Sequence, residues 1–232
     1  MSEIYASKLR MLGFSLPGLG LNTLVTAVFV FLPALYVESR GLPTATVGLV
    51  FFLAKIIDMV AAPIWGTFMD SYKTRWGRRR PWLIVSVPIL MTAIFFLFHP
   101  PEDVSVYYLF FGLALCYIGW DAFTISHTSW ALELSRDYDR RSRITGLLQV
   151  MSMLGAIAVS IVPTVMERIG VFSHEEKTVA IGWAIMVIIP LTVFFCVISV
   201  PERETLNKPR TGFIKGIKIL IANTALIRLL LA

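Results

Sequence analysis

The sequence predicts an all-α integral membrane protein with six transmembrane helices, and three observations support this fold class. Apolar residues make up 56% of the 232 residues and charged residues only 16%, well below the roughly 25% of soluble domains. The apolar residues fall into six long blocks, each near or above the ~20 residues that a helix needs to cross a bilayer. The basic residues gather in alternate connections between these blocks. A soluble helical domain of this length could not bury six such blocks.

The six blocks predict transmembrane helices at residues 12–37, 43–69, 82–98, 105–132, 144–166 and 178–200. Pro81 suits the first turn of the third helix, and Trp82 suits the membrane interface. Residues 201–218 are mostly polar and predict a cytoplasmic linker with an amphipathic segment around Phe213 to Leu220. Residues 219–232 are typical of the truncated start of a seventh helix. We therefore expect residues 1–200 to form one six-helix domain.

The basic residues also predict the orientation. If the N-terminus is cytoplasmic, sixteen lysines and arginines lie on the inner side of the membrane and three on the outer side. By the positive-inside rule, this asymmetry predicts a cell (inner) membrane protein with a cytoplasmic N-terminus. The three outer residues are Arg40, Arg168 and Lys177. The net charge of +6 is thus explained by topology and does not indicate a nucleic-acid partner.

The sequence contains little that indicates an enzyme. Both cysteines fall within predicted helices, and the three histidines match no metal-ligand spacing. We find no phosphate-binding glycine loop and no nucleophile elbow. We therefore expect no catalytic residues, no metal site and no cofactor.

The most specific string in the chain is the connection "GTFMDSYKTRWGRRRPW", residues 66–82. Gly66 could let a neighbouring helix approach closely. Asp70 follows one turn later, at a helix C-terminus where the dipole disfavours an anion, so we expect a compensating partner for it. The arginines that follow are Arg75, Arg78, Arg79 and Arg80. Taken alone, they are also compatible with a simple topological anchor.

This string resembles the cytoplasmic loop between the second and third helices of the major facilitator superfamily. More narrowly, it is similar to the glycoside–pentoside–hexuronide:cation symporters, the melibiose-permease-like branch. Three further stretches share the resemblance, which covers essentially the whole chain as an N-terminal half. They are "AKIIDMVAAPIWG" from residue 54, "ISHTSWALELSRDYDRRSRITG" from residue 125 and "ALIRLLLA" at the end.

The resemblance implies a six-helix bundle of two inverted three-helix repeats, packed against a second six-helix half. It implies a secondary transporter that moves a sugar or sugar-like solute by alternating access, coupled to H⁺ or to Na⁺. Under this interpretation, the residues around Gly66 and Asp70 and the arginine cluster form a cytoplasmic gating latch. The only other partner it implies is the lipid bilayer.

Several polar groups are predicted to lie inside the bilayer. The helical rise places Asn22, Asp58 and Asp121 at similar depths, slightly on the cytoplasmic side of the membrane centre. Lys55 is one turn from Asp58, so the two can pair along one face. An ionised group at the bilayer centre costs at least ~2.5 kcal/mol and normally faces a partner or a cavity. Two hypotheses remain open: a structural ion pair, or an Asp58 that binds a proton or cation.

The resemblance assigns further roles by position. Asp58 matches the first carboxylate of the family's cation site, and the second falls at Ala62. Other positions that are charged in the family are occupied here by the uncharged residues Asn22, Thr124 and Leu148. A site with few carboxylates is better suited to a proton than to Na⁺. The candidate cation or proton ligands are Asp58, Asp121, Asn22 and Thr124. The candidate solute-binding residues are Lys55, Asn22, Trp120, Asp121 and Gln149, with His127 and Trp130 as further polar or stacking groups.

A different class of function also fits the six helices. The chain could be a non-transporting six-helix membrane subunit, or a fragment that acts only as an assembly partner. A coding sequence that continues into six more transmembrane helices would favour the transporter, and a true stop after Ala232 would favour the subunit.

Overall fold

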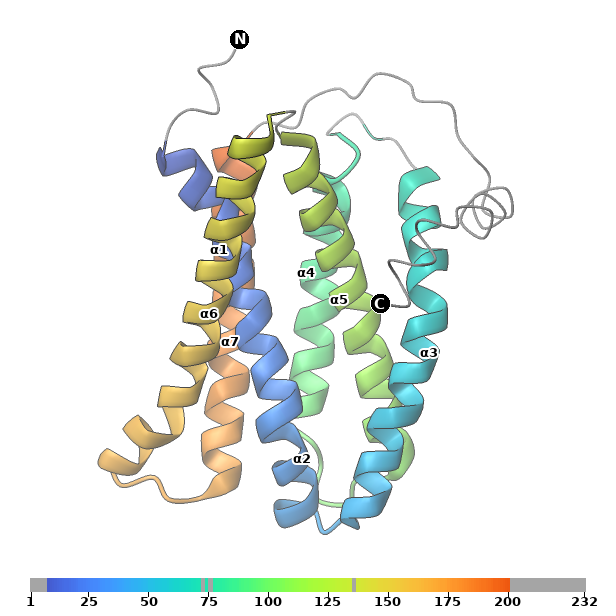
Figure 1. The fold of residues 1–232 in the computed structure, drawn as a ribbon. Coiled ribbons are helices and arrows are strands. Elements are labelled where there is room, and N and C mark those ends of the chain that lie inside the picture. The colour runs from blue at the N-terminus through green and yellow to red at the C-terminus, as the bar shows by residue number, and fades with distance from the viewer. Residues whose placement is uncertain (1–7, 72–73, 75–76, 135–136, 201–232) are drawn as a thin grey trace, which may run out of the picture. The chain divides into compact units, whose positions relative to one another are not determined.

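The structure, a computed structural model, describes residues 8–71, 74, 77–134 and 137–200. The expected linker, its amphipathic segment and the start of a seventh helix lie outside the described residues and stay predictions. The described elements are helical (Figure 1). In chain order they are α1 (Lys8–Thr26), η2 (Ala27–Phe31), α2 (Leu32–Ala34), η3 (Leu35–Ser39), α3 (Thr44–Ser71), α4 (Arg80–Phe98), α5 (Val106–Leu134), α6 (Tyr138–Arg168) and α7 (His174–Ser199).

Six helices in the described part of the chain are long and apolar enough to cross a membrane. They run over Leu9–Ser39, Thr44–Met69, Arg80–Phe98, Val106–Leu134, Tyr138–Arg168 and His174–Ser199. All six predicted transmembrane helices are therefore confirmed. The last two begin four to six residues earlier than predicted because a polar cap starts each helix before its apolar block. Asp137 accepts hydrogen bonds from two backbone amides at the start of α6, and Ser173 accepts one at the start of α7.

The first transmembrane helix is not uniformly α-helical. Two π-helical segments, η2 and η3, flank the short α2 that contains Pro33. Proline cannot donate an intrahelical hydrogen bond, and a π-helical turn is one way in which a helix absorbs such an interruption. The C-terminal half of this helix is held by the Tyr36 hydroxyl, which donates to the Leu97 carbonyl of α4 at 3.2 Å.

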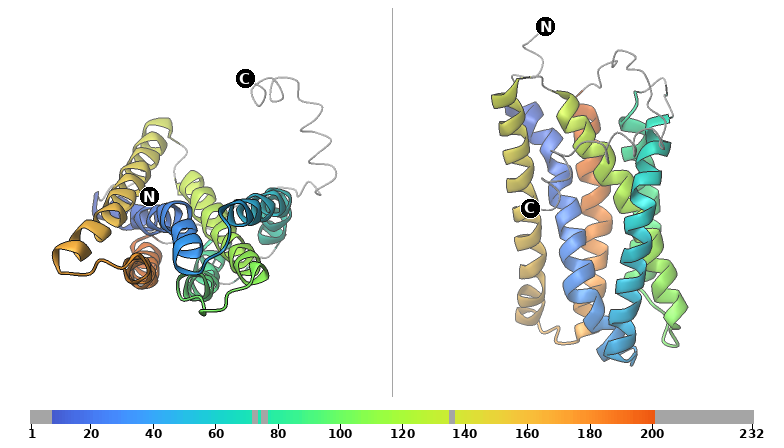
Figure 2. Two further views of the ribbon diagram at one scale, coloured as in Figure 1. Left: turned by 90° about the horizontal axis from the view of Figure 1, so that it is seen from below. Right: turned by 45° about the vertical axis from the view of Figure 1, so that its right-hand side comes forward.

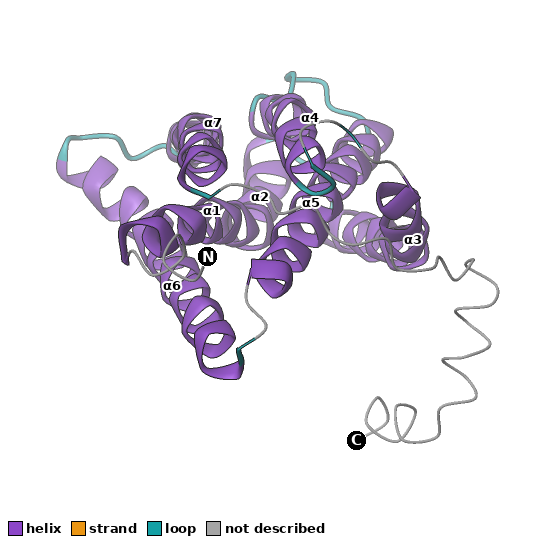
Figure 3. Cartoon of the chain, turned by 90° about the horizontal axis from the view of Figure 1, so that it is seen from above, coloured by secondary structure: helices purple, strands orange, loops and turns teal. Residues whose placement is uncertain are grey.

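The helix pairs follow an internal symmetry (Figures 2 and 3). Helix α1 packs against α6 and α7, α5 packs against α3 and α4, and α4 packs against α7. If the first three transmembrane helices are exchanged in order for the last three, the two pairs of α1 become the two pairs of α5, and the pair of α4 with α7 becomes itself. Because three membrane crossings leave the chain on the side opposite to where it started, the second repeat is inverted relative to the first. The predicted bundle of two inverted three-helix repeats is therefore confirmed.

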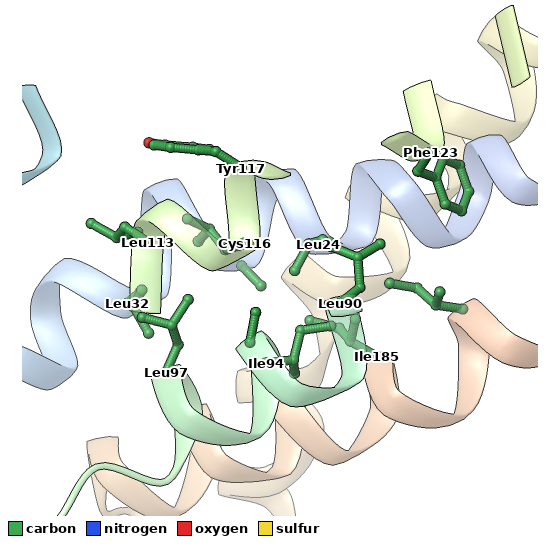
Figure 4. Close-up of a cluster of buried hydrophobic side chains, with 14 of the residues drawn as sticks. Leu24, Leu32, Leu90, Ile94, Leu97, Leu113, Cys116, Tyr117, Phe123 and Ile185 are labelled. Atoms are coloured by element: carbon green, nitrogen blue, oxygen red, sulfur yellow. The ribbon is translucent and has the colours of Figure 1, made fainter. Parts of the chain in front are cut away.

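The hydrophobic core lies among α1, α4, α5 and α7 (Figure 4). Leu24 of α1, Ile94 of α4, Leu113 of α5 and Ile185 of α7 are fully buried there. Helices α3 and α6 contribute less, because each buries only 17% of its membrane window against 50% for α5. These two helices correspond to each other in the internal symmetry and lie on opposite sides of the bundle in Figure 3.

Candidate cation site between α3 and α5

The centre of the candidate site is the predicted pair on α3. The Lys55 ammonium lies 2.6 Å from Asp58 Oδ2, so the predicted pairing along one helix face is confirmed. The two partners differ in burial: 8% of the Asp58 side chain is exposed, against 58% of the Lys55 side chain. The same ammonium lies 4.9 Å from the centre of the Tyr117 ring on α5. Lys55 is thus held both by a carboxylate and by the face of an aromatic ring.

A second carboxyl reaches this pair from α5. The Asp121 carboxyl lies close enough to the Asp58 carboxyl to interact with it electrostatically, and two neighbouring carboxylates repel each other unless a proton or a cation is shared. Asp121 Oδ2 is buried without a hydrogen-bond partner. The place on α3 where the family pattern has a second carboxylate is occupied by half-buried Ala62. The neighbouring helix therefore supplies the carboxyl that α3 lacks.

Two hydroxyl groups on α5 extend the site. Tyr117, Asp121 and Thr124 are spaced by four and three residues and share one helix face. Within the described residues, the Tyr117 and Thr124 hydroxyls are buried without hydrogen-bond partners, like Asp121 Oδ2. Buried polar groups are normally paired, so these three oxygen atoms are unusual.

The charges of the site do not cancel. Lys55 contributes one positive charge, whereas ionised Asp58 and Asp121 contribute two negative charges. The resulting charge of −1 is costly inside a bilayer. One proton or one monovalent cation would neutralise it.

Tyr117 was missed by the sequence reasoning. A local signal existed, because Tyr117 lies one turn before Asp121 on the same helix face. In Figure 4 the Tyr117 side chain extends away from the labelled aliphatic side chains, with its hydroxyl outermost. Its proximity to Lys55 depends on how α3 and α5 pack, which spacing along α5 does not reveal.

The remaining predicted ligands lie in different surroundings. The Asn22 side-chain amide donates to the Ser152 carbonyl at 2.9 Å and so ties α1 to α6. Gln149 is exposed on α6. Trp120 is partly buried against the hydrophobic core. The structure therefore brings Lys55, Asp58 and Asp121 together with Tyr117. Thr124 shares the helix face of Asp121, and the roles of all these residues stay predictions.

His127 and Trp130 belong to a packed aromatic cluster near the end of α5. His127 is buried, and its Nε2 lies 2.9 Å from the Phe14 carbonyl of α1. The Trp130 ring meets the Phe14 ring edge-on at a centroid distance of 5.2 Å. Arg80 covers the Trp130 ring at 5.6 Å. Within the described chain these contacts favour a packing role for both residues.

Two arginines of the basic loop bind helix ends within this bundle. Arg79 Nε lies 3.4 Å from Glu133 near the end of α5. Arg80 donates to the carbonyls of Val197 and Val200 at the end of α7, the second at 2.8 Å. A cation at a helix C-terminus satisfies unpaired carbonyls and opposes the helix dipole.

The other latch residues are less informative. Gly66 is not a site of close approach within the described residues, because a Cβ there would meet only Ile125 Cδ1, at 3.9 Å. The expectation of tight helix packing at Gly66 is therefore wrong for this bundle. Arg78 lies two residues before α4 and is half-buried. The Asp70 side chain and Arg75 lie outside the described residues, so the predicted latch stays a prediction.

The fold and the intramembrane charges define a multi-pass helical membrane protein with the architecture of one major facilitator half. Residues 13–232 match the family model described as "MFS/sugar transport protein". The chain belongs to this family, within the major facilitator superfamily, and its resemblance to the glycoside–pentoside–hexuronide:cation symporters is confirmed.

Curated relatives support the same family. The chain is 27% identical to the isoprimeverose transporter of Lactiplantibacillus pentosus, over 80% of this chain and 40% of that protein. It is 24% identical to the glucuronide carrier protein homolog of Escherichia coli, over 84% and 43%. It is 27% identical to the lactose permease of Leuconostoc lactis, over 94% and 33%. The chain spans less than half the length of these relatives, which are named as transporters, carriers or permeases and not as enzymes.

Proposed function

We propose that this chain is the N-terminal six-helix half of a secondary transporter that moves a sugar or sugar-like solute by alternating access. The inverted repeats support this proposal, because such repeats can rock around a binding site near the membrane centre. The names of the relatives support a sugar-like solute. The proposal places Lys55, Asn22, Trp120 and Gln149 on the solute side, with the second six-helix half as the partner that completes the cavity.

The observation that carries the proposal is the carboxyl pair between α3 and α5. Asp58 and Asp121 interact electrostatically across neighbouring helices of a bundle whose helices are long and apolar enough to span a membrane. Intramembrane carboxylates are costly and typically mark ion or proton pathways. With Lys55 beside them, the group lacks one positive charge. We propose that one coupling cation, H⁺ or Na⁺, supplies it.

The available oxygen atoms bear on the choice of ion. A proton needs only the carboxyl pair. Na⁺ needs several oxygen ligands, and the Tyr117 and Thr124 hydroxyls could complete such a set because both are buried without partners. The Asp121 carboxyl of α5 thus gives the site a second carboxyl in place of the one that is absent at Ala62. With two carboxyls the site is more compatible with Na⁺ than it would be with Asp58 alone.

The test is solute uptake by the full-length protein in membrane vesicles. We would supply isoprimeverose, lactose and a glucuronide in turn, with an imposed pH gradient or an imposed Na⁺ gradient. Asp58→Asn and Asp121→Asn should abolish accumulation driven by the gradient, because neither variant retains both carboxyls. Exchange of solute without a gradient should continue.

The matched control is Asp103→Asn, which makes the same chemical change in the exposed outer connection between α4 and α5. This variant should accumulate solute as the wild type does. Undiminished accumulation by both site variants would refute the coupling role of the carboxyl pair.

A further inference from the structure

Lys55 sits where a transported cation would have to sit. Its ammonium lies 2.6 Å from one oxygen of Asp58, and Asp58 is the carboxyl that Asp121 approaches from the neighbouring helix. We propose that Lys55 is a tethered cation, which occupies the carboxyl pair when no H⁺ or Na⁺ is bound there and leaves when one binds. We further propose that Tyr117 is a positioning residue, whose ring holds the ammonium on the pair. This inference rests on the proposed function.

The burial of the partners shows which of them can move. Asp58 has 8% of its side chain exposed, so packing fixes its carboxylate. Lys55 has 58% exposed and a flexible four-carbon stem. Exchange of the ammonium for another cation therefore requires a side-chain rotation and no movement of α3. The carboxylate stays in place to receive the incoming ion.

The Tyr117 ring stabilises the state in which Lys55 occupies the pair. The ammonium lies 4.9 Å from the ring centre while it also contacts Asp58, so both interactions are made in one position. A cation–π contact depends on the ring and not on the hydroxyl. Tyr117 and buried Cys116 are the other titratable groups on α5 that interact electrostatically with Asp58.

The exchange also links the cation to the solute. When H⁺ or Na⁺ takes the place of the ammonium on Asp58, Lys55 turns towards the exposed side of α3 but stays beside the pair. The two carboxylates, the bound cation and the ammonium then carry no net charge together. An ammonium donates three hydrogen bonds, and the hydroxyl oxygens of a sugar-like solute accept them. Cation binding therefore increases the affinity for solute, and by thermodynamic linkage solute increases the affinity for the cation by the same factor.

The test is cation binding to the purified full-length protein, with Na⁺ measured by calorimetry and H⁺ by proton uptake at fixed pH. Lys55→Met should lower the half-saturating concentration of the coupling cation about tenfold, which corresponds to a competing ion pair of about 1.4 kcal/mol. Tyr117→Leu should lower it about threefold because the cation–π contact is lost. Tyr117→Phe loses the hydroxyl, as Tyr117→Leu does, but keeps the ring, so it should not show the gain in cation affinity that Tyr117→Leu shows.

A second readout separates this role from a structural one. In Lys55→Met, added isoprimeverose or lactose should no longer increase cation affinity, whereas it should do so in the wild type. If Lys55→Met does not fold, the comparison of Tyr117→Leu with Tyr117→Phe decides, since both retain the lysine.

The outcomes separate this inference from the proposed function. Unchanged cation affinity in Lys55→Met, or equal affinities in the two Tyr117 variants, would overturn the tethered cation while the coupling site stands. Cation binding that is absent from the wild type, or unaffected by Asp58→Asn, would instead refute the coupling site itself. A heat of Na⁺ binding without proton uptake identifies Na⁺ as the ion that Lys55 replaces. Proton uptake without a heat of Na⁺ binding identifies H⁺.

Discussion

Single residues set the distance between α1 and α6. A Cβ on Gly155 would lie 2.2 Å from the Leu19 carbonyl oxygen, which belongs to the backbone and cannot rotate aside. At the same contact, the Thr23 hydroxyl lies 3.2 Å from the Gly155 carbonyl, and Asn22 donates to the Ser152 carbonyl. Small residues at helix interfaces permit such backbone approach, and polar side chains then join the helices.

Gly155→Ala should destabilise the protein by about 2 kcal/mol, because the added methyl group forces α1 and α6 apart. The matched control is Gly146→Ala on the same helix, where a Cβ meets nothing within 4 Å. That change should stabilise the protein by about 0.5–1 kcal/mol, since alanine favours helix over glycine. Thermal unfolding in detergent measures both variants. Equal shifts in the same direction would show that α1 and α6 do not approach as described.

Among the elements, the ends of three helices meet at Arg40, on the side of the bundle that is predicted to face outwards. Its guanidinium donates to the Pro100 carbonyl beyond α4 at 3.0 Å and to Glu175 in the first turn of α7 at 2.5 Å. The Arg40 side chain is 10% exposed. The hydrogen bond to Glu175 raises the pKa of Arg40 above its ordinary value, so the group stays charged. Arg40 therefore connects the end of η3 to the ends of α4 and α7.

A double-mutant cycle with Arg40→Ala and Glu175→Ala should give a coupling energy of about 1 kcal/mol in thermal unfolding. The pair is charged and hydrogen-bonded, but Glu175 is 40% exposed and solvent weakens the interaction. The control cycle uses Glu38 and His174, which lie 3.7 Å apart with both side chains more than half exposed. Its coupling should be near zero, and similar values from the two cycles would contradict the role of Arg40.

At the scale of the whole molecule, charge asymmetry predicts which face of the bundle is cytoplasmic. The connection between α4 and α5, which is predicted to lie on the outer side, contains exposed Glu102 and Asp103. Tyr138, at the start of α6, is 83% exposed on the predicted inner side. The cysteines of the chain, Cys116 and Cys196, are both buried, so introduced cysteines can be labelled against a low background.

In intact cells, Asp103→Cys should react with a membrane-impermeant maleimide, and Tyr138→Cys should react only after permeabilisation. The reason is that the positive-inside rule keeps the arginine-rich connections in the cytoplasm. Labelling is read by a shift in gel mobility. The reverse pattern would place the N-terminus outside the cell and overturn the predicted orientation.

Much of the fold could be predicted from local features of the sequence. Six apolar blocks predict six helices because a buried peptide group in lipid has no water to bind and must pair within its helix. The spacing of Lys55 and Asp58 predicts their contact because residues three apart lie on one helix face. The π-helical segments around Pro33 were not predicted, since a proline alone does not reveal how its helix will accommodate it.

The candidate site was less predictable because its parts come from different helices. The sequence identifies Asp58 and Asp121 as intramembrane carboxyls, and family position identifies Thr124. It does not show that Asp58 meets Asp121, or that Lys55 lies on Tyr117. It also assigned Asn22 to the cation site, whereas the structure joins its amide to the Ser152 carbonyl of α6.

Hydrophobicity, charge order and helical spacing therefore establish that the chain is a six-helix membrane protein with ionisable groups within the bilayer. These properties are local, because each depends on a continuous stretch of chain and its solvent. The partnership of the carboxyls, the aromatic support of Lys55 and the close approach at Gly155 depend on the packing of helices distant in sequence. Only the tertiary structure decides them, because the relative rotation of two helices selects which side chains meet.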